Sequence, residues 1–408
     1  MHNDGYVYSA GQLTMNVNEK FIIDILRSFI NNEGVVIPRD VDWGTIVHLA
    51  KINSISAIVW YVLSISGIDA VPDNVKQSLF EEYNCTLTMS INRDEHMKRL
   101  IEVLNSNGID HLLFKGYVVK DLYTIPELRT FGDIDFAIRR DDRKKCDTLM
   151  RHRGYQSEAD WEPVYSYKDG VEYYEVHTEI IDSNLNNKCD YIAYFRDFWQ
   201  HALRIDQNTF SLSPEYHLIF LLMHIVKHLY GSGAGIRMYL DIAFYINKYR
   251  NQIDWKHFSQ EIEQLKISKF FNIAFCAVEK WFGIESPIAL KETDDEFSNQ
   301  FLTFTLKGGV FGFDDKPASL SLLRKNTDEK GVRRLKAFLS RAFPSAKTIE
   351  VRYTYLQNKH WLLPVAWVHR LYKKDRSVAE YVRSSKELFL TDKDDILKLQ
   401  KIYNYLEI

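Results

Sequence analysis

Residues 110–135 read DHLLFKGYVVKDLYTIPELRTFGDID, and this stretch decides the fold. The apolar run at 110–114 predicts a buried strand, which ends at Lys115-Gly116 and leads into a short helix. After a loop, residues 133–138 alternate between polar and apolar side chains, which is the period of a strand. We therefore expect two strands joined by a short helix and a loop.

The sequences on either side of these strands indicate helices. Upstream, apolar residues recur at helical spacing across 17–107, and a long helix is expected from about 73 to 107. Downstream, 162–167 and 171–181 predict two more strands joined by a hairpin turn, and helical spacing resumes from about residue 191. The expected fold class is α+β, a small mixed-sheet core flanked by helical regions. The expected domains are 1–107 (N-terminal helical region), 108–205 (α/β core) and 206–408 (C-terminal helical region).

The overall charge of the chain does not indicate a nucleic-acid partner, because 408 residues carry a formal net charge of only −3. The charge is unevenly distributed. Residues 316–388 contain 17 Lys and Arg against 6 Asp and Glu, a local balance of 17 − 6 = +11. Such a segment is usually a solvated helix surface, but it also allows nucleic acid or another polyanion as a partner.

The cysteines and the apolar segments indicate the compartment. The four cysteines match neither a zinc motif nor a disulfide framework, so we expect free thiols in a reducing environment. The first residues lack the basic and apolar parts of a signal peptide, and no apolar stretch is long enough to form a transmembrane segment. We therefore expect a cytoplasmic protein.

The pair Asp133-x-Asp135 is the first candidate for chemistry. Residues two apart on a strand project from the same face, so both carboxylates should point the same way. Two such charges repel each other, and a divalent cation removes the repulsion. Mg²⁺ or Mn²⁺ binds carboxylate oxygens together with substrate phosphates, and two such ions can promote phosphoryl transfer.

Two further segments add to this pair. Gly116 would let the backbone approach a ligand, helix-start amides attract phosphate, and Lys115 would add a cation. On the strand expected at 171–181, Glu175 and His177 share one face and could lie beside the aspartates. Each feature alone is common, as a turn or as a surface strand, and the combination is what carries information.

Taken together, these segments resemble the uncharacterised nucleotidyltransferase family of bacteria, within the polymerase-β-like superfamily. The resemblance covers about 20–285 and rests on Leu112-Leu113-Phe114-Lys115-Gly116, Leu122-Tyr123, Pro126, Arg129, Gly132-Asp133-Ile134-Asp135, Arg153-Gly154-Tyr155 and Glu175-Val176-His177, with the helical stretch from His224 to Asp241. It implies that Asp133, Asp135 and Glu175 are the catalytic, metal-binding acids, with His177 beside them. Lys115, Gly116 and Arg129 would bind or orient phosphates, although the superfamily usually has a small residue where Lys115 stands.

The helical stretch supplies four more candidates. His224 and His228 lie one turn apart, a spacing that permits zinc binding, although no third ligand is evident and a nucleotide-facing or structural role fits better. Arg237 and Asp241 have the same spacing and would most simply form an intrahelical ion pair. The resemblance implies a nucleotide-binding role for all four.

The implied activity is transfer of a nucleoside monophosphate from an NTP to an acceptor, which could be a protein, an RNA, a sugar or a small molecule. One alternative is a glycosyltransferase that uses its D-x-D to hold a metal under a sugar nucleotide. That fold needs alternating strands and helices before the D-x-D, whereas this chain reads as helix there. Another alternative is a non-catalytic nucleotide-binding module.

Overall fold

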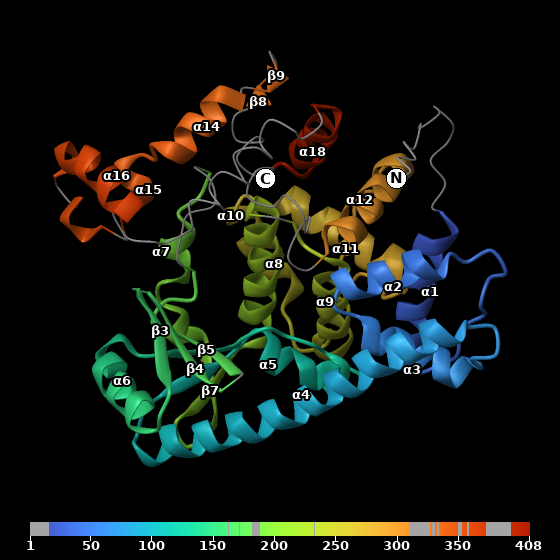
Figure 1. The fold of residues 1–408 in the computed structure, drawn as a ribbon, viewed down its shortest axis with the longest axis horizontal. Coiled ribbons are helices and arrows are strands. Elements are labelled where there is room, and N and C mark those ends of the chain that lie inside the picture. The colour runs from blue at the N-terminus through green and yellow to red at the C-terminus, as the bar shows by residue number, and fades with distance from the viewer. Residues whose placement is uncertain are drawn as a thin grey trace.

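The computed structural model describes residues 16–161, 163–170, 172–181, 188–231, 233–309, 327–328, 331–332, 334–349, 353–356, 359–372 and 393–408. A seven-stranded mixed sheet lies among helices contributed by both ends of the chain (Figure 1). This arrangement confirms the expected α+β class, with helical regions flanking the sheet.

The N-terminal helices are α1 (Val17–Asn31), α2 (Trp43–Ile52), α3 (Ser56–Ser66) and α4 (Asp73–Ser106). Helix α1 begins where the Asn16 side chain accepts a hydrogen bond from the backbone of Glu19, and its buried apolar face packs in the main core. Helix α4 has 34 residues and runs along one side of the molecule, past both α3 and the sheet (Figure 1). The long helix predicted up to the Asn107-Gly108 stop is therefore confirmed.

The sheet has the order β3-β4-β5-β2-β1-β7-β6. Strand β1 pairs antiparallel with β2 and parallel with β7, while β2 pairs parallel with β5. The strands that carry the sequence motifs, β1, β2 and β5, are thus central neighbours. The bounds are β1 His111–Leu113, β2 Ile134–Ile138, β3 Gln156–Trp161, β4 Val164–Asp169, β5 Glu172–His177, β6 Ala202–Asp206 and β7 Thr209–Leu212.

Three of these strands were not expected from the sequence. Strand β3 is an edge strand of polar composition, which gives it little hydrophobic periodicity. Strands β6 and β7 form a short hairpin, and β7 is held by its parallel pairing with β1. Such short strands are stabilised by tertiary pairing more than by their own propensity. The sheet consequently continues to Leu212, beyond the core boundary expected at 205.

Between β1 and β2 lie α5 (Gly116–Val119) and two 3₁₀ turns, and α6 (Arg143–His152) follows β2. After the sheet come α8 (Pro214–Gly231), α9 (Ile236–Tyr249), α10 (Trp255–Gln264), α11 (Ser268–Phe282) and α12 (Asp295–Gly308). Helices α8 and α9 stand next to each other in Figure 1, to the right of the labelled strands of the sheet. Helix α9 is tied to the segment before β2 by a hydrogen bond from Arg129 to Asp241.

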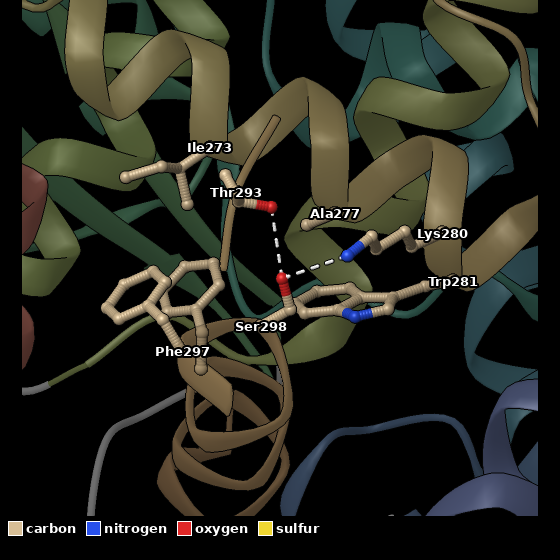
Figure 2. A pocket seen from close by; sticks show the side chains of 8 residues that line it. Ile273, Ala277, Lys280, Trp281, Thr293, Phe297 and Ser298 are labelled. Atoms are coloured by element: carbon tan, nitrogen blue, oxygen red, sulfur yellow. Dashed lines mark hydrogen bonds between the residues drawn. The ribbon is translucent and has the colours of Figure 1, made fainter. Parts of the chain in front are cut away.

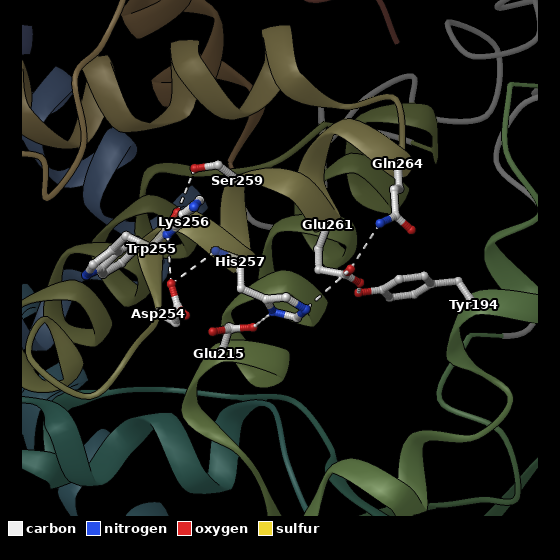
Figure 3. Close-up of polar contacts among 9 residues, drawn as sticks. All are labelled: Tyr194, Glu215, Asp254, Trp255, Lys256, His257, Ser259, Glu261 and Gln264. Carbon is white, nitrogen blue, oxygen red and sulfur yellow. Dashed lines mark hydrogen bonds and ion pairs between the residues drawn. The ribbon is translucent and has the colours of Figure 1, made fainter.

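A polar cluster ties α7 (Tyr191–Phe195), α8 and α10 together (Figure 3). His257 lies 2.5 Å from Glu215 and 3.7 Å from Glu261, and the Tyr194 hydroxyl donates to Glu261 at 2.6 Å. Half of the His257 side chain is exposed, so these contacts fix helix positions without enclosing a site.

A shallow pocket separates α11 from α12 (Figure 2). Ser298 accepts from Lys280 at 3.3 Å and lies 3.0 Å from the Thr293 hydroxyl. The rest of its lining is mostly apolar side chains, including Trp281 and Phe297, and neither α11 nor α12 carries any of the expected acids. This pocket is therefore a packing feature of the C-terminal helices.

The last described helices are α14 (Arg334–Ala342), α15 (Ala346–Ile349), α16 (Leu363–Tyr372) and α18 (Lys393–Leu406). The basic segment at 316–388 is described only in part, and Arg333, Lys373, Lys374 and Arg376 lie outside the described residues. Within the described parts, no helix combines the length and the apolar character needed to cross a bilayer.

Candidate active site

The central strands bring two carboxylates and one imidazole together. Asp135 on β2 is the direct register partner of Glu175 on the parallel strand β5, and His177 follows Glu175 by two residues. Because residues two apart share a face of a strand, all three side chains project from the same face. Among the described residues, these three form the one group of possible metal ligands whose donor atoms lie within 4.8 Å of one another.

Asp135 is the most strongly engaged of these groups. It is 5% exposed, and its Oδ1 accepts from Lys115 Nζ at 2.6 Å and lies 2.8 Å from His177 Nε2. Burial alone would raise the pKa of Asp135, but the Lys115 ammonium and the His177 contact outweigh burial and hold the pKa well below its usual range. Asp135 is therefore ionised at neutral pH. His177 also lies 3.5 Å from Glu175 and packs its ring edge-to-face with Phe114.

Asp133 precedes β2 and is half-buried. Burial and the negative charges of Asp135 and Glu175 raise its pKa to about 6, although Lys115 acts in the opposite direction. Asp133 thus lies within electrostatic reach of the other acids but outside the tight group of Asp135, Glu175 and His177. Three carboxylates share one ammonium here, which leaves negative charge uncompensated.

Lys115 reaches these acids from a strained backbone. Its backbone φ is 54° and its ψ is −136°, a conformation that residues other than glycine rarely adopt. Burial lowers the pKa of its ammonium, but Asp135 and Asp133 outweigh burial and raise it. Such strain is often found where a side chain is positioned for function. Helix α5 beyond it has only four residues, so the expected phosphate-attracting helix start is a single turn.

Gly116 makes room for a side chain of the protein. A Cβ at this position would lie 2.4 Å from Arg129 Nη1 and 3.0 Å from Phe131. The glycine therefore lets the Arg129 guanidinium pass close to the backbone. The expected approach of a ligand to Gly116 stays a prediction.

Arg129 binds Asp241 through two hydrogen bonds, Nη2 to Oδ2 at 2.7 Å and Nε to Oδ1 at 3.2 Å. The Tyr123 hydroxyl donates to the same Oδ1 at 2.7 Å. All three residues are buried. The intrahelical pair expected between Arg237 and Asp241 is therefore wrong, because Asp241 is taken by a bidentate partner from the loop before β2.

A second buried arginine supports this loop from the long helix. Arg93 on α4 donates from Nε to Glu172 at 2.7 Å and also donates to the Phe131 carbonyl. Its guanidinium and that of Arg129 both lie over the Phe131 ring, at 4.9 Å and 5.8 Å. Neither Arg93 nor Glu172 was singled out from the sequence. The available signal would have been a charged residue at helical spacing from the buried residues Met97, Leu100 and Leu104.

His224 and His228 face each other on α8, with their Nε2 atoms 3.2 Å apart. Burial, reinforced by neighbouring positive charges, lowers the pKa of both imidazoles, that of His228 to about 4. Both rings are therefore neutral at physiological pH, and one donates to the other. No cluster of possible ligands in the described part of the chain includes them, which gives the zinc hypothesis no support.

Comparison of the chain with known proteins gave one match, to a protein family. The model of a family described as "Uncharacterised nucleotidyltransferase" matches residues 39–283, which span α2 through α11 and include every strand of the seven-stranded sheet. No curated protein and no solved structure showed significant similarity to the chain.

Proposed function

The chain belongs to the uncharacterised nucleotidyltransferase family, and from this premise we propose that it transfers a nucleoside monophosphate from an NTP to an acceptor hydroxyl with a divalent cation. The observation that carries the proposal is the pairing of Asp135 with Glu175 across β2 and β5, with Asp133 in electrostatic reach. This arrangement concentrates three acids at one place on a buried sheet.

The donor set suits Mg²⁺ or Mn²⁺, because both ions prefer carboxylate oxygens. The raised pKa of Asp133 supports this fit, since it reflects burial of the carboxylate and the nearby negative charges of Asp135 and Glu175, which Lys115 offsets only in part. Asp133, Asp135 and Glu175 would hold the cations. When bound, the ions would activate the acceptor oxygen and stabilise the leaving pyrophosphate.

The protein's own groups position these acids. His177 holds Asp135 through the 2.8 Å contact, and Phe114 packs against the imidazole and fixes its plane. Lys115 neutralises Asp135 in the free protein, and its flexible side chain can turn toward a donor phosphate as a point charge. Lys115 would therefore act in both states, pairing with Asp135 in the free protein and with a donor phosphate when the nucleotide is bound.

The glycosyltransferase alternative receives no support from the structure. Such an enzyme would place alternating strands and helices before its D-x-D. The described residues from 16 to 110 contain α1 to α4 and no strand.

The test is transfer of label from each of the four α-³²P NTPs, with Mg²⁺ or Mn²⁺, to a fractionated lysate. We expect labelling by the wild type and its loss in Asp133→Ala/Asp135→Ala. The matched control is Asp141→Ala/Asp142→Ala, which removes the same charge from the 3₁₀ turn after β2. Equal labelling by the wild type and the first double variant would rule out the proposed site.

A further inference from the structure

Arg237 lies in the first turn of α9 and is a buried cation without a counter-ion of its own. It is 8% exposed, and its Nε and Nη1 atoms have no hydrogen-bond acceptor among the described residues. Burying a charge without a partner costs several kcal/mol, so a protein retains such a group only when something offsets the cost. The missing acceptor points to a ligand.

The obvious internal partner is already occupied. Asp241 is one turn further along α9, but both of its oxygens accept from Arg129, and Tyr123 donates to one of them. One carboxylate thus lies in electrostatic reach of two guanidinium groups but is hydrogen-bonded to only one of them, that of Arg129. This part of the site carries an excess of positive charge.

The guanidinium of Arg237 lies within electrostatic reach of one of the acids described above, Asp133. Burial and the charge of Arg129 lower its pKa to about 10, while Asp241 and Asp133 act in the opposite direction. Arg237 in turn contributes to the lowered pKa of His228. It therefore remains charged at neutral pH and sits within electrostatic reach of both Asp133 and His228.

The start of α9 adds to this positive character. The helix has 14 residues, and its N-cap is Gly235, which offers no side chain to accept from the first amides. The first amide, that of Ile236, donates to Asn53. The helix dipole places partial positive charge at the same end, beside Arg237.

We propose that Arg237 and the start of α9 bind a phosphate group of the substrate. This inference rests on the proposed function and divides the site into two parts. The acids would take the cation, and Arg237 would take phosphate oxygens further along the donor. A phosphate could come from the triphosphate of an NTP or from a phosphodiester of a nucleic-acid acceptor, and the same guanidinium chemistry would bind either.

The primary test is calorimetric titration with tripolyphosphate in EDTA, which needs neither cation nor turnover. We expect the wild type to bind and Arg237→Met to lose at least tenfold in affinity. Arg237→Lys should recover part of the loss, because the lysine ammonium keeps the positive charge but lacks the forked N–H donors of the guanidinium. Arg99→Met removes a positive charge from the exposed face of α4 and should bind like the wild type. A wild type that does not bind, or an Arg237→Met within twofold of it, would overturn the proposal.

The source of the phosphate is decided by two further ligands, a non-hydrolysable NTP and a short oligonucleotide without a triphosphate. If Arg237→Met loses affinity only for the NTP, the phosphate belongs to the donor. If it loses affinity only for the oligonucleotide, the phosphate belongs to the acceptor. Equal retention of both would contradict the proposal.

A stability measurement separates binding from a structural role. If Arg237 is held for a ligand, Arg237→Met should melt at the same temperature as the wild type or above it, because an unpaired buried charge has been removed. A melting temperature lowered by several degrees, with tripolyphosphate affinity unchanged, would make Arg237 structural. Because binding is read without metal or transfer, the phosphate site can stand when no label is transferred. Equally, the phosphate site can be refuted by the titration while nucleotidyl transfer is still observed.

Discussion

Removing the Lys115 ammonium should change the pH at which the proposed metal site binds a cation. Asp133 must be ionised to hold Mg²⁺ or Mn²⁺, and its pKa is raised to about 6. Cation binding should thus be complete well above pH 6 and fall as the pH drops through about 6. Lys115 lowers the pKa of Asp133, so Lys115→Met should move this loss to higher pH.

The size of the effect follows from the local charges. Lys115 Nζ is 2.6 Å from Asp135 Oδ1, and the Lys115 side chain is 16% exposed, so solvent screens the pair little. An opposite charge this close to a carboxylate changes its pKa by about one to three units, and Asp133 lies beyond the direct contact. We expect the midpoint of Mn²⁺ binding to rise by about one pH unit, equivalent to ~1.4 kcal/mol.

The assay is Mn²⁺ binding followed by electron paramagnetic resonance between pH 5 and 8. Lys98→Met serves as the control, because Lys98 is exposed on α4. A midpoint that is the same in Lys115→Met, Lys98→Met and the wild type would refute the electrostatic role of Lys115. In separate titrations with a non-hydrolysable NTP, Lys115→Ala should lose about tenfold in affinity, or ~1.4 kcal/mol. A loss below twofold would identify a turn residue outside the site.

Four other variants test the supporting structure. Gly116→Ala should lower the free energy of unfolding in urea by about 1–3 kcal/mol, because its Cβ would collide with Arg129; an unchanged midpoint would contradict this. Arg93→Met should lower it by about 3–5 kcal/mol, since Glu172 would remain buried without a partner; the double variant with Glu172→Leu should recover much of the loss. His228→Gln tests pH dependence. The pKa of His228 is lowered from 6.5 to about 4, so the unfolded chain takes up the proton first, and stability is lost as pH falls through this window. The variant should show a shallower loss in melts between pH 7 and 4.

The sequence predicted the elements whose signals are local. The stop at Asn107-Gly108 marked the end of α4, and the alternation before Ile138 marked β2. The resemblance on these motifs led to the family that the comparison confirmed. Strands β3, β6 and β7 gave no such signal. Strand β3 is polar and, among the described strands, β6 pairs only with β7, while β7 is held by its pairing with β1, about 100 residues earlier in the chain.

Side-chain partners were harder to predict than strands. The spacing of Arg237 and Asp241 favoured an intrahelical pair, yet Asp241 binds Arg129, which is 112 residues away. A spacing rule counts only local partners, and the bidentate contact with a buried guanidinium is stronger than an intrahelical pair. Pairing at such separation is decided by packing, and the sequence alone does not show it.

The separation of charge across the site explains why the acids and the guanidinium groups occur together. Asp133, Asp135 and Glu175 have Lys115 as their nearby ammonium, which leaves a deficit of positive charge. Arg129 binds Asp241 and leaves Arg237 without an acceptor among the described residues for its Nε and Nη1 atoms, which leaves an excess. A cation alone would satisfy only the acids, and an anion alone would satisfy only Arg237. Under the proposed function, a metal–nucleotide complex would present both charges in one ligand and so complement both parts at once. The cost of keeping each part unbalanced in the free protein is then recovered by a single binding event.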